Sequence, residues 1–177
     1  TVKYDAKSTT KTATTIGTNV ITTLTNYNKS DLAQFDGIFR FSKLSRLIDA
    51  TDSSILSNIT TLKISKTITP VLNAPSQYIL DFSNALYNPH SGHNSLMGGI
   101  VSSTGFTISG NSNTVYLDDD GAGNIRTYYI VGGTTRTYVG DAVGTINYST
   151  GLITLPSLTI TSTVNTNSIE IITQPKS

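Results

Sequence analysis

Apolar residues recur at helical spacing in the first fifty residues. One stripe of a helix is formed by Ala13, Ile16, Val20, Ile21, Leu24 and Tyr27. The many threonines between them weaken this pattern, because β-branching lowers helix propensity. We expect this helix to stop within residues 26–30. A second, shorter helix is expected from Ser42, a preferred N-cap residue, because Leu44, Leu47 and Ile48 form an apolar face one turn long.

After Asp52 the apolar residues alternate with polar ones, which is the period of a β-strand. Leu62, Ile64 and Ile68 lie on one face of the first expected strand, and Pro70 ends it. Further strands are expected at residues 77–82, 106–108, 115–117, 125–131, 136–139, 145–148, 152–155, 158–163 and 169–173. These strands are short and separated by turn residues, which is typical of a sheet-rich domain.

Two connections in this region differ in kind. Residues 149–151 form a short hairpin loop with Gly151 at a position that favours positive φ. Residues 84–99 show no period, and we expect a long loop there, of the kind that is often functional.

The two patterns together predict an α+β fold, in which N-terminal helices precede a mainly antiparallel β-sheet region. We expect residues 1–52 to form a helical segment and residues 53–177 a β-rich domain, joined in one compact unit. The chain starts at Thr1 without an initiator Met, so we expect it to be a piece of a longer protein.

The polar residues of the chain are largely uncharged. The chain holds 30 Thr, 21 Ser and 14 Asn, which is 65 of its 177 residues, whereas charged residues make up 13%. Such a composition favours many short strands with polar outer faces. A net charge of +1 argues against nucleic acid and a polybasic membrane anchor as partners. No apolar run is long enough to span a bilayer, so no membrane partner is expected.

Few residues offer catalytic chemistry. The chain has no Cys, and Glu170 is its only Glu, so a thiol nucleophile is excluded and a pair of catalytic carboxylates is poorly supported. The glycine pairs at residues 98–99 and 132–133 lack the Lys of a phosphate-binding loop. The sequence therefore predicts no enzyme and no cofactor.

Two groups of residues resemble metal sites in part. Residues 118–124 match the start of a calcium loop, but Tyr129 stands where a bidentate Glu is needed. We interpret this run as a solvated turn between two strands. His90 and His93 have the spacing of a metal pair without a third ligand, and we interpret them as surface-loop histidines. We expect no metal.

Aromatic residues are the best candidates for an interface. Phe39, Phe41, Tyr138 and Tyr148 belong to two aromatic groups, and Tyr is enriched where proteins meet. Burial in the core and pairing across strands are the alternative roles of these side chains.

Several stretches, in their order along the chain, resemble one known family. They are FRFSKLSRLIDA (39–50), DSSILSNIT (52–60), YNPH (87–90), GGIVSSTGF (98–106), DDGAGNIR (119–126) and VGTINYSTGLI (143–153). Together they resemble the C-terminal part of the T4-type baseplate wedge protein of contractile-tailed phages, the gene product six family. The resemblance extends from about residue 39 to residue 155.

This resemblance implies a structural role and no catalytic residues. The family builds baseplate wedges, and its self-association joins wedges into a ring around the tail hub. The implied partners are a second copy in a homodimer and other baseplate wedge proteins. The implied location is the virion tail baseplate, after assembly in the host bacterial cytoplasm. A receptor- or carbohydrate-binding β-domain of a phage fibre or bacterial adhesin fits the same composition and the loop at 84–99, and stays open as the alternative.

Overall fold

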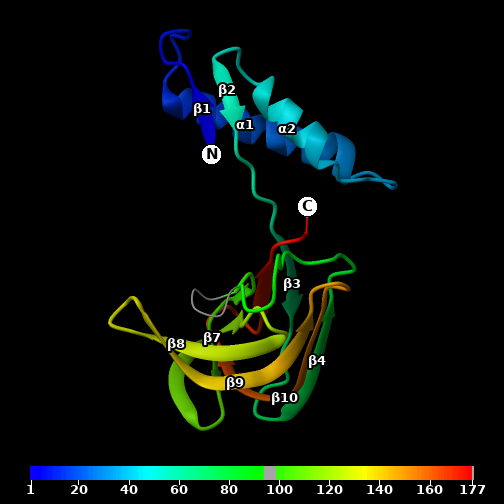
Figure 1. The fold of residues 1–177 in the computed structure, drawn as a ribbon, viewed down its shortest axis with the longest axis vertical. Coiled ribbons are helices and arrows are strands. Elements are labelled where there is room, and N and C mark those ends of the chain that lie inside the picture. Colours follow the sequence, from blue (N-terminus) through cyan, green and yellow to red (C-terminus); the bar gives the residue numbers. More distant parts are fainter. Residues whose placement is uncertain (94–98, 177) are drawn as a thin grey trace. The chain divides into compact units, whose positions relative to one another are not determined.

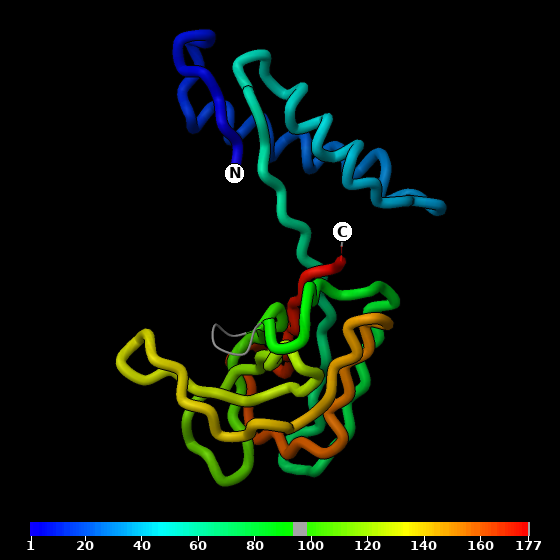
Figure 2. Tube along the Cα trace, viewed as in Figure 1, coloured from blue at the N-terminus to red at the C-terminus, as the bar shows by residue number. Residues whose placement is uncertain are grey.

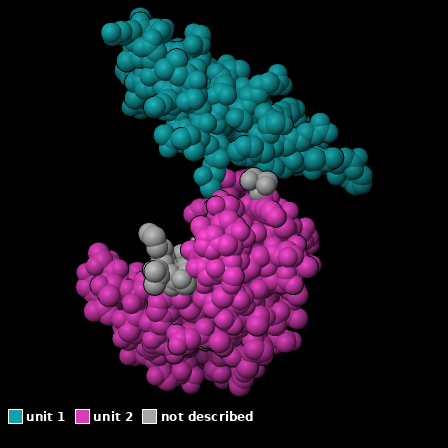
Figure 3. All heavy atoms as spheres, in the orientation of Figure 1, with its two compact units in different colours: residues 1–61 teal, residues 62–177 magenta. Residues whose placement is uncertain are grey.

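The structure, a computed structural model, describes residues 1–93 and 99–176. The chain divides into two compact units, residues 1–61 (unit 1) and residues 62–177 (unit 2), coloured separately in Figure 3. Each unit has its own hydrophobic core, and each is described by itself.

Unit 1 consists of a helical pair and a two-stranded ribbon (Figure 1). Its elements are β1 (Val2–Tyr4), α1 (Ala13–Tyr27), the π-helical turn η1 (Asn28–Leu32), α2 (Phe41–Asp49) and β2 (Ile55–Asn58). β1 and β2 pair antiparallel. A small core of Tyr27, Leu44 and Ile48 lies between the elements, with Val2, Val20, Leu32 and Leu47 packed against it.

Helix α1 confirms the helix expected from the apolar stripe. Thr12 is its N-cap, and the Thr12 side chain accepts a hydrogen bond from the Thr15 N–H. The hydroxyls of Thr18, Thr22 and Thr25 each donate to the backbone carbonyl four residues earlier. These bonds give the hydroxyls acceptors within the helix itself.

Helix α2 starts earlier than the sequence predicts. Phe41 is its first residue and Arg40 occupies the cap position without a side-chain cap bond, so the prediction that Ser42 is the N-cap is wrong. Leu44 and Ile48 are buried in the core of unit 1 and Leu47 packs against it. The apolar face was therefore identified more accurately than the helix end.

Unit 2 is built around a closed barrel (Figures 1 and 2). Its strands are β3 (Ile64–Ile68), β4 (Pro75–Asp81), β5 (Ser102–Ser103), β6 (Phe106–Ile108), β7 (Asn111–Asp119), β8 (Asn124–Val131), β9 (Thr135–Asn147), β10 (Leu152–Thr163) and β11 (Ile169–Thr173). The strands of the barrel are hydrogen-bonded in the order β10, β6, β7, β8 and β9. The pairing of β9 with β10 closes the ring. All these pairs are antiparallel.

Strand β10 closes this barrel and joins it to β4. Its first residues, Leu152–Thr154, pair with β9 on one side and with β4 on the other. Its last residues pair with β6. The sequence predicts separate strands at 152–155 and 158–163, on either side of Pro156. That prediction is wrong, since a register shift between Leu155 and Leu158 carries the strand past the proline.

The rest of unit 2 is a small sheet of three strands, in which β11 pairs antiparallel with β3 on one side and β5 on the other. Side chains from this sheet and from the barrel share one core. Its fully buried members include Phe106, Leu117, Ile125, Ile153, Leu155, Ile160, Ile169 and Ile171.

The expected α+β fold class is wrong, because the molecule is mostly β. Strands hold 44% of its residues and helices 17%. The expectation treated the C-terminal region as a sheet of consecutive hairpins. The pairing of β10 with β9 and β6 instead closes the strands into a five-stranded barrel, a long-range feature that the local apolar period does not contain.

Candidate interaction surface and buried acidic network

The segment that connects η1 to α2, residues 33–40, and the first residue of α2 expose large apolar side chains. Phe35 is 103% exposed, Ile38 is 64% exposed, and Phe39 and Phe41 are 37% and 44% exposed. Single apolar side chains on a surface need no explanation, but several so close in the chain mark a candidate interaction site. We name these four residues the apolar cluster.

Hydrogen bonds fix the shape of the connecting segment. The Gly37 N–H donates to the Gln34 carbonyl at 3.1 Å, and Gln34 Nε2 donates to the Lys29 carbonyl at 2.7 Å. A Cβ atom at Gly37 would lie 2.3 Å from the Leu32 carbonyl oxygen, so the turn needs a residue without a side chain. The apolar cluster thus stands on an ordered turn.

Tyr27, at the end of α1, anchors the segment near its other end. The Tyr27 hydroxyl accepts a hydrogen bond from the Arg40 N–H at 2.9 Å, and its ring meets Phe39 edge-on with ring centres 6.2 Å apart. Lys43 of α2 forms an ion pair with Asp31 of η1. The hydrogen bond from Lys43 holds the pKa of Asp31 below its ordinary value. Tyr27 therefore holds the segment to α1, and the ion pair holds η1, which precedes the segment, to α2.

The sequence candidates Phe39 and Phe41 are partly exposed in this structure, and their role in an interface stays a prediction. Phe35 and Ile38, which are the more exposed pair, are not among the interface residues predicted from the sequence. The dipeptide Asp36–Gly37 was a usable signal, because Asp-Gly marks a turn and a residue beside a tight turn is turned toward solvent.

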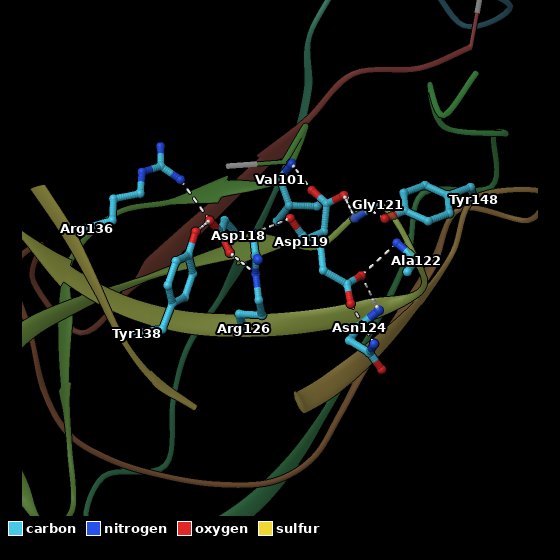
Figure 4. A network of polar contacts seen from close by, with 11 residues as sticks. Val101, Asp118, Asp119, Gly121, Ala122, Asn124, Arg126, Arg136, Tyr138 and Tyr148 are labelled. Carbon is cyan, nitrogen blue, oxygen red and sulfur yellow. Dashed lines mark hydrogen bonds and ion pairs between the residues drawn. The ribbon is translucent and has the colours of Figure 1, made fainter. Parts of the chain in front are cut away.

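A network of polar side chains lies inside unit 2, where β7, β8 and β9 are neighbours (Figure 4). Asp118 of β7 is 1% exposed. Its Oδ1 accepts from Arg126 Nε at 2.9 Å, and its Oδ2 accepts from Arg136 Nη1 and the Tyr138 hydroxyl, both at 2.8 Å. Arg126 belongs to β8, and Arg136 and Tyr138 belong to β9. One carboxylate therefore links three strands of the barrel.

The neighbouring carboxylate, Asp119, bonds to other parts of the chain. It accepts from the Val101 N–H at 2.8 Å, the Tyr148 hydroxyl at 2.6 Å and the Gly121 N–H at 3.3 Å. A Cβ atom at Gly99 would lie 1.6 Å from Asp119 Oδ1, so the chain before β5 approaches this carboxylate closely. Asp119 thus fastens the segment before β5 and the end of β9 to β7.

The expectation of a solvated turn at residues 118–124 is wrong for its first two residues. Asp118 and Asp119 belong to β7 and are buried. The turn starts at Asp120, whose carboxylate accepts from the Ala122 and Asn124 N–H groups at 2.7 and 2.9 Å. Burial of Asp118 is tolerated because the hairpin register places the Arg126 cation opposite it. The first two aspartates of the run therefore belong to a buried hydrogen-bond network, and the third begins the turn.

Tyr138 and Tyr148, the other two interface candidates, donate their hydroxyls to this network. Burial, followed by the hydrogen bond to a carboxylate, raises the pKa of both phenols. Both side chains remain partly accessible, and their role in an interface stays a prediction.

His90 and His93 are exposed and touch each other, with His93 Nδ1 3.1 Å from His90 Nε2. Across residues 1–93 and 99–176, no three His, Cys, Asp or Glu side chains are grouped to hold a metal ion. The expected loop at 84–99 includes residues 94–98, which lie outside the described residues. No helix in the described part of the chain is long and apolar enough to cross a membrane.

Comparison with known families gives a match that covers unit 1. Residues 1–67 match the family described as baseplate structural protein gp6, C-terminal domain III. The matched residues include the whole of unit 1 with its apolar cluster and end within β3. This match confirms the family resemblance expected from the sequence, and the stretches at 87–153 lie beyond it. No curated protein matches the chain significantly.

Proposed function

Since residues 1–67 belong to the baseplate structural protein gp6 family through its C-terminal domain III, we propose that this chain associates with itself through unit 1. In this proposal the contact joins baseplate wedges into the ring around the tail hub. The coarser function follows from the family: the chain is a structural protein of a phage tail baseplate. The observation that carries the finer proposal is the apolar cluster, which is exposed and lies within the matched residues.

Burial of the apolar cluster against a partner would favour association. A large apolar side chain gains roughly 1.5–3 kcal/mol when it is fully removed from water. The core of unit 1 does not include Phe35 or Ile38, so their exposed surface is available to a partner. The ordered turn beneath them lowers the conformational entropy that association would cost. Preformed aromatic residues of this kind often dominate binding energy.

The family also supports contacts with other baseplate components. We propose that these are neighbouring wedge proteins and that assembly takes place in the host bacterial cytoplasm. The absence of Cys fits folding in a reducing compartment. A net charge of +1 provides no basic surplus for nucleic acid, which favours proteins as the partners.

The proposal is tested by measuring the molar mass of the full chain by light scattering over a concentration series. We expect a dimer that dissociates on dilution. Phe35→Ala should shift dissociation to higher concentration without lowering the melting temperature of the dilute, monomeric chain. Ile79→Ala is the matched control, because Ile79 is also exposed, at 61%, but lies on β4 of unit 2. A monomer at every concentration would overturn the proposal, as would equal effects of the two variants.

A further inference from the structure

Two opposite charges flank the centre of the connecting segment. Asp36 precedes Ile38 by two residues and Arg40 follows it by two. Both charged side chains are exposed, and they line the same surface depression as Ile38. They are therefore presented on a common side of the segment, beside the apolar cluster.

Neither charge is neutralised within the described part of the chain. The ion pairs there join Lys11 to Asp52, Lys43 to Asp31, and both Arg126 and Arg136 to Asp118. The neighbouring charges Asp31 and Lys43 satisfy each other and do not compete for Asp36 or Arg40. An aspartate and an arginine thus stand unpaired on either side of an exposed isoleucine.

This pattern is complementary to itself under a two-fold rotation. In a two-fold contact, residue i of one copy meets residue j of the other, and residue j meets residue i. An axis near Ile38 would bring Asp36 of each copy to Arg40 of the other. Two ion pairs would then form on the two sides of an apolar centre. A surface of a single charge sign would instead repel its own copy.

We propose that a second copy of this chain docks on the connecting segment about a two-fold axis near Ile38, with Asp36 of each copy paired to Arg40 of the other. This rests on the proposed self-association and adds its geometry and its pairing rule. The apolar cluster supplies the buried area, and the charges set the orientation. The occupant is a second copy because one surface supplies both members of each ion pair.

A charge exchange tests this geometry on the full chain. Asp36→Arg alone would place two arginines opposite each other in each pair, and Arg40→Asp alone would place two aspartates there. Each single variant should weaken self-association by at least about tenfold, because like charges would meet. The double variant D36R/R40D recreates both ion pairs with reversed sense and should associate within about threefold of the parent chain.

Mixing the two single variants gives a second, independent readout. A D36R chain and an R40D chain should form a heterodimer more tightly than either forms a homodimer, because opposite charges meet at both pairs. The matched controls are Asp141→Arg and Lys63→Asp, which make the same charge changes at exposed positions of unit 2. Neither control should change self-association.

The substitutions should leave unit 1 folded. The bonds of Arg40 to Tyr27 use the Arg40 backbone N–H and carbonyl, and the bond that closes the turn joins Gly37 to Gln34. Melting temperatures of all variants check this point. A dimer that responds to Phe35→Ala but not to the charge variants would overturn this geometry and leave the proposed self-association standing. Failure of the double variant to restore the dimer would overturn it too. A parent chain that never dimerises would overturn both.

Discussion

Asp118 is the central acceptor of the buried polar network in unit 2. Its carboxylate accepts bonds from Arg126, Arg136 and Tyr138. The two guanidiniums also lie over aromatic rings, Arg126 over Tyr138 and Arg136 over Tyr128, each 4.3 Å from the ring centre. Charge, hydrogen bond and ring contact thus interlock on three strands. Loss of the carboxylate charge disturbs all of these contacts together.

Asp118→Asn should therefore destabilise unit 2 strongly. Removing one partner of a buried ion pair costs about 3–5 kcal/mol, because the opposite charge stays buried without its counterion. The control is Asp141→Asn on the exposed surface of β9, which should change stability by less than about 0.5 kcal/mol. Urea unfolding of both variants measures the difference. Equal stability of the two variants would refute the role given to Asp118.

Tyr148 should make unit 2 sensitive to alkali. Burial and the hydrogen bond to Asp119 raise the pKa of its phenol in the folded chain. An unfolded chain releases this proton near the ordinary tyrosine pKa of about 10, while the folded chain retains it. The stabilising contribution is therefore complete below about pH 10 and is lost as pH rises above that value.

In Tyr148→Phe the loss of stability above about pH 10 should be smaller, whatever the stability at neutral pH. Melting temperatures between neutral and strongly alkaline pH provide the measurement. Tyr129→Phe is the comparison, because Tyr129 is also partly accessible, whereas the phenols that donate to Asp118 and Asp119 are those of Tyr138 and Tyr148. Parallel pH curves for the parent and Tyr148→Phe would contradict the prediction.

The burial of individual aspartates was harder to predict than their presence in the sequence. The sequence showed three adjacent aspartates, but it did not show which of them a strand would bury. A hairpin centred near Ala122 places Asp118 opposite Arg126, and that pairing was the missing signal. Arg136 and Tyr138 come from the next strand along the chain. Their approach to Asp118 depends on β-sheet register, which residue type alone does not reveal.

Among the elements, α1 contains a glycine whose replacement should stabilise the helix. Gly17 lies in the middle of the helix, and a Cβ atom there would meet no atom within 4 Å. Gly17→Ala should stabilise unit 1 by about 0.5–1 kcal/mol, because Ala loses less backbone entropy in a helix. Thermal unfolding followed by helical circular dichroism measures this effect.

Gly37→Ala makes the opposite case and serves as the contrast. There a Cβ atom would lie 2.3 Å from the Leu32 carbonyl oxygen, so the turn would have to open. This variant should lower the melting temperature of unit 1. If both substitutions were stabilising, the turn would not have the tight geometry described for it.

Elements with several periods of apolar residues were predictable, whereas the very short strands were predicted in part. The stripe from Ala13 to Tyr27 coincides with α1, and Gly151 has the positive φ, 78°, expected of its hairpin loop. Strands β1 and β5, of three and two residues, were not predicted, whereas the three-residue strand β6 was. The strands expected at 152–155 and 158–163 proved to be one, because the register shift that joins them depends on the pairing with β4.

At the scale of the whole molecule, sequence reasoning found the family that residues 1–67 match, but not the closed barrel. Residues 39–60 carried part of the resemblance and lie within the matched region. The barrel depends on the pairing of β10 with both β9 and β6, strands that lie at very different distances from β10 along the chain. Local spacing contains no information on such pairing, whereas a family resemblance uses the order of many residues together.

The position of β10 in the chain also sets the order in which the two units can form during translation. All residues of unit 1 have been synthesised once the chain reaches Thr61. The barrel stays open until β10 is complete at Thr163, because both β6 and β9 pair with it. Its high contact order makes its folding the slower step. A ribosome-bound chain can therefore fold unit 1 and present its apolar cluster while the barrel is still incomplete.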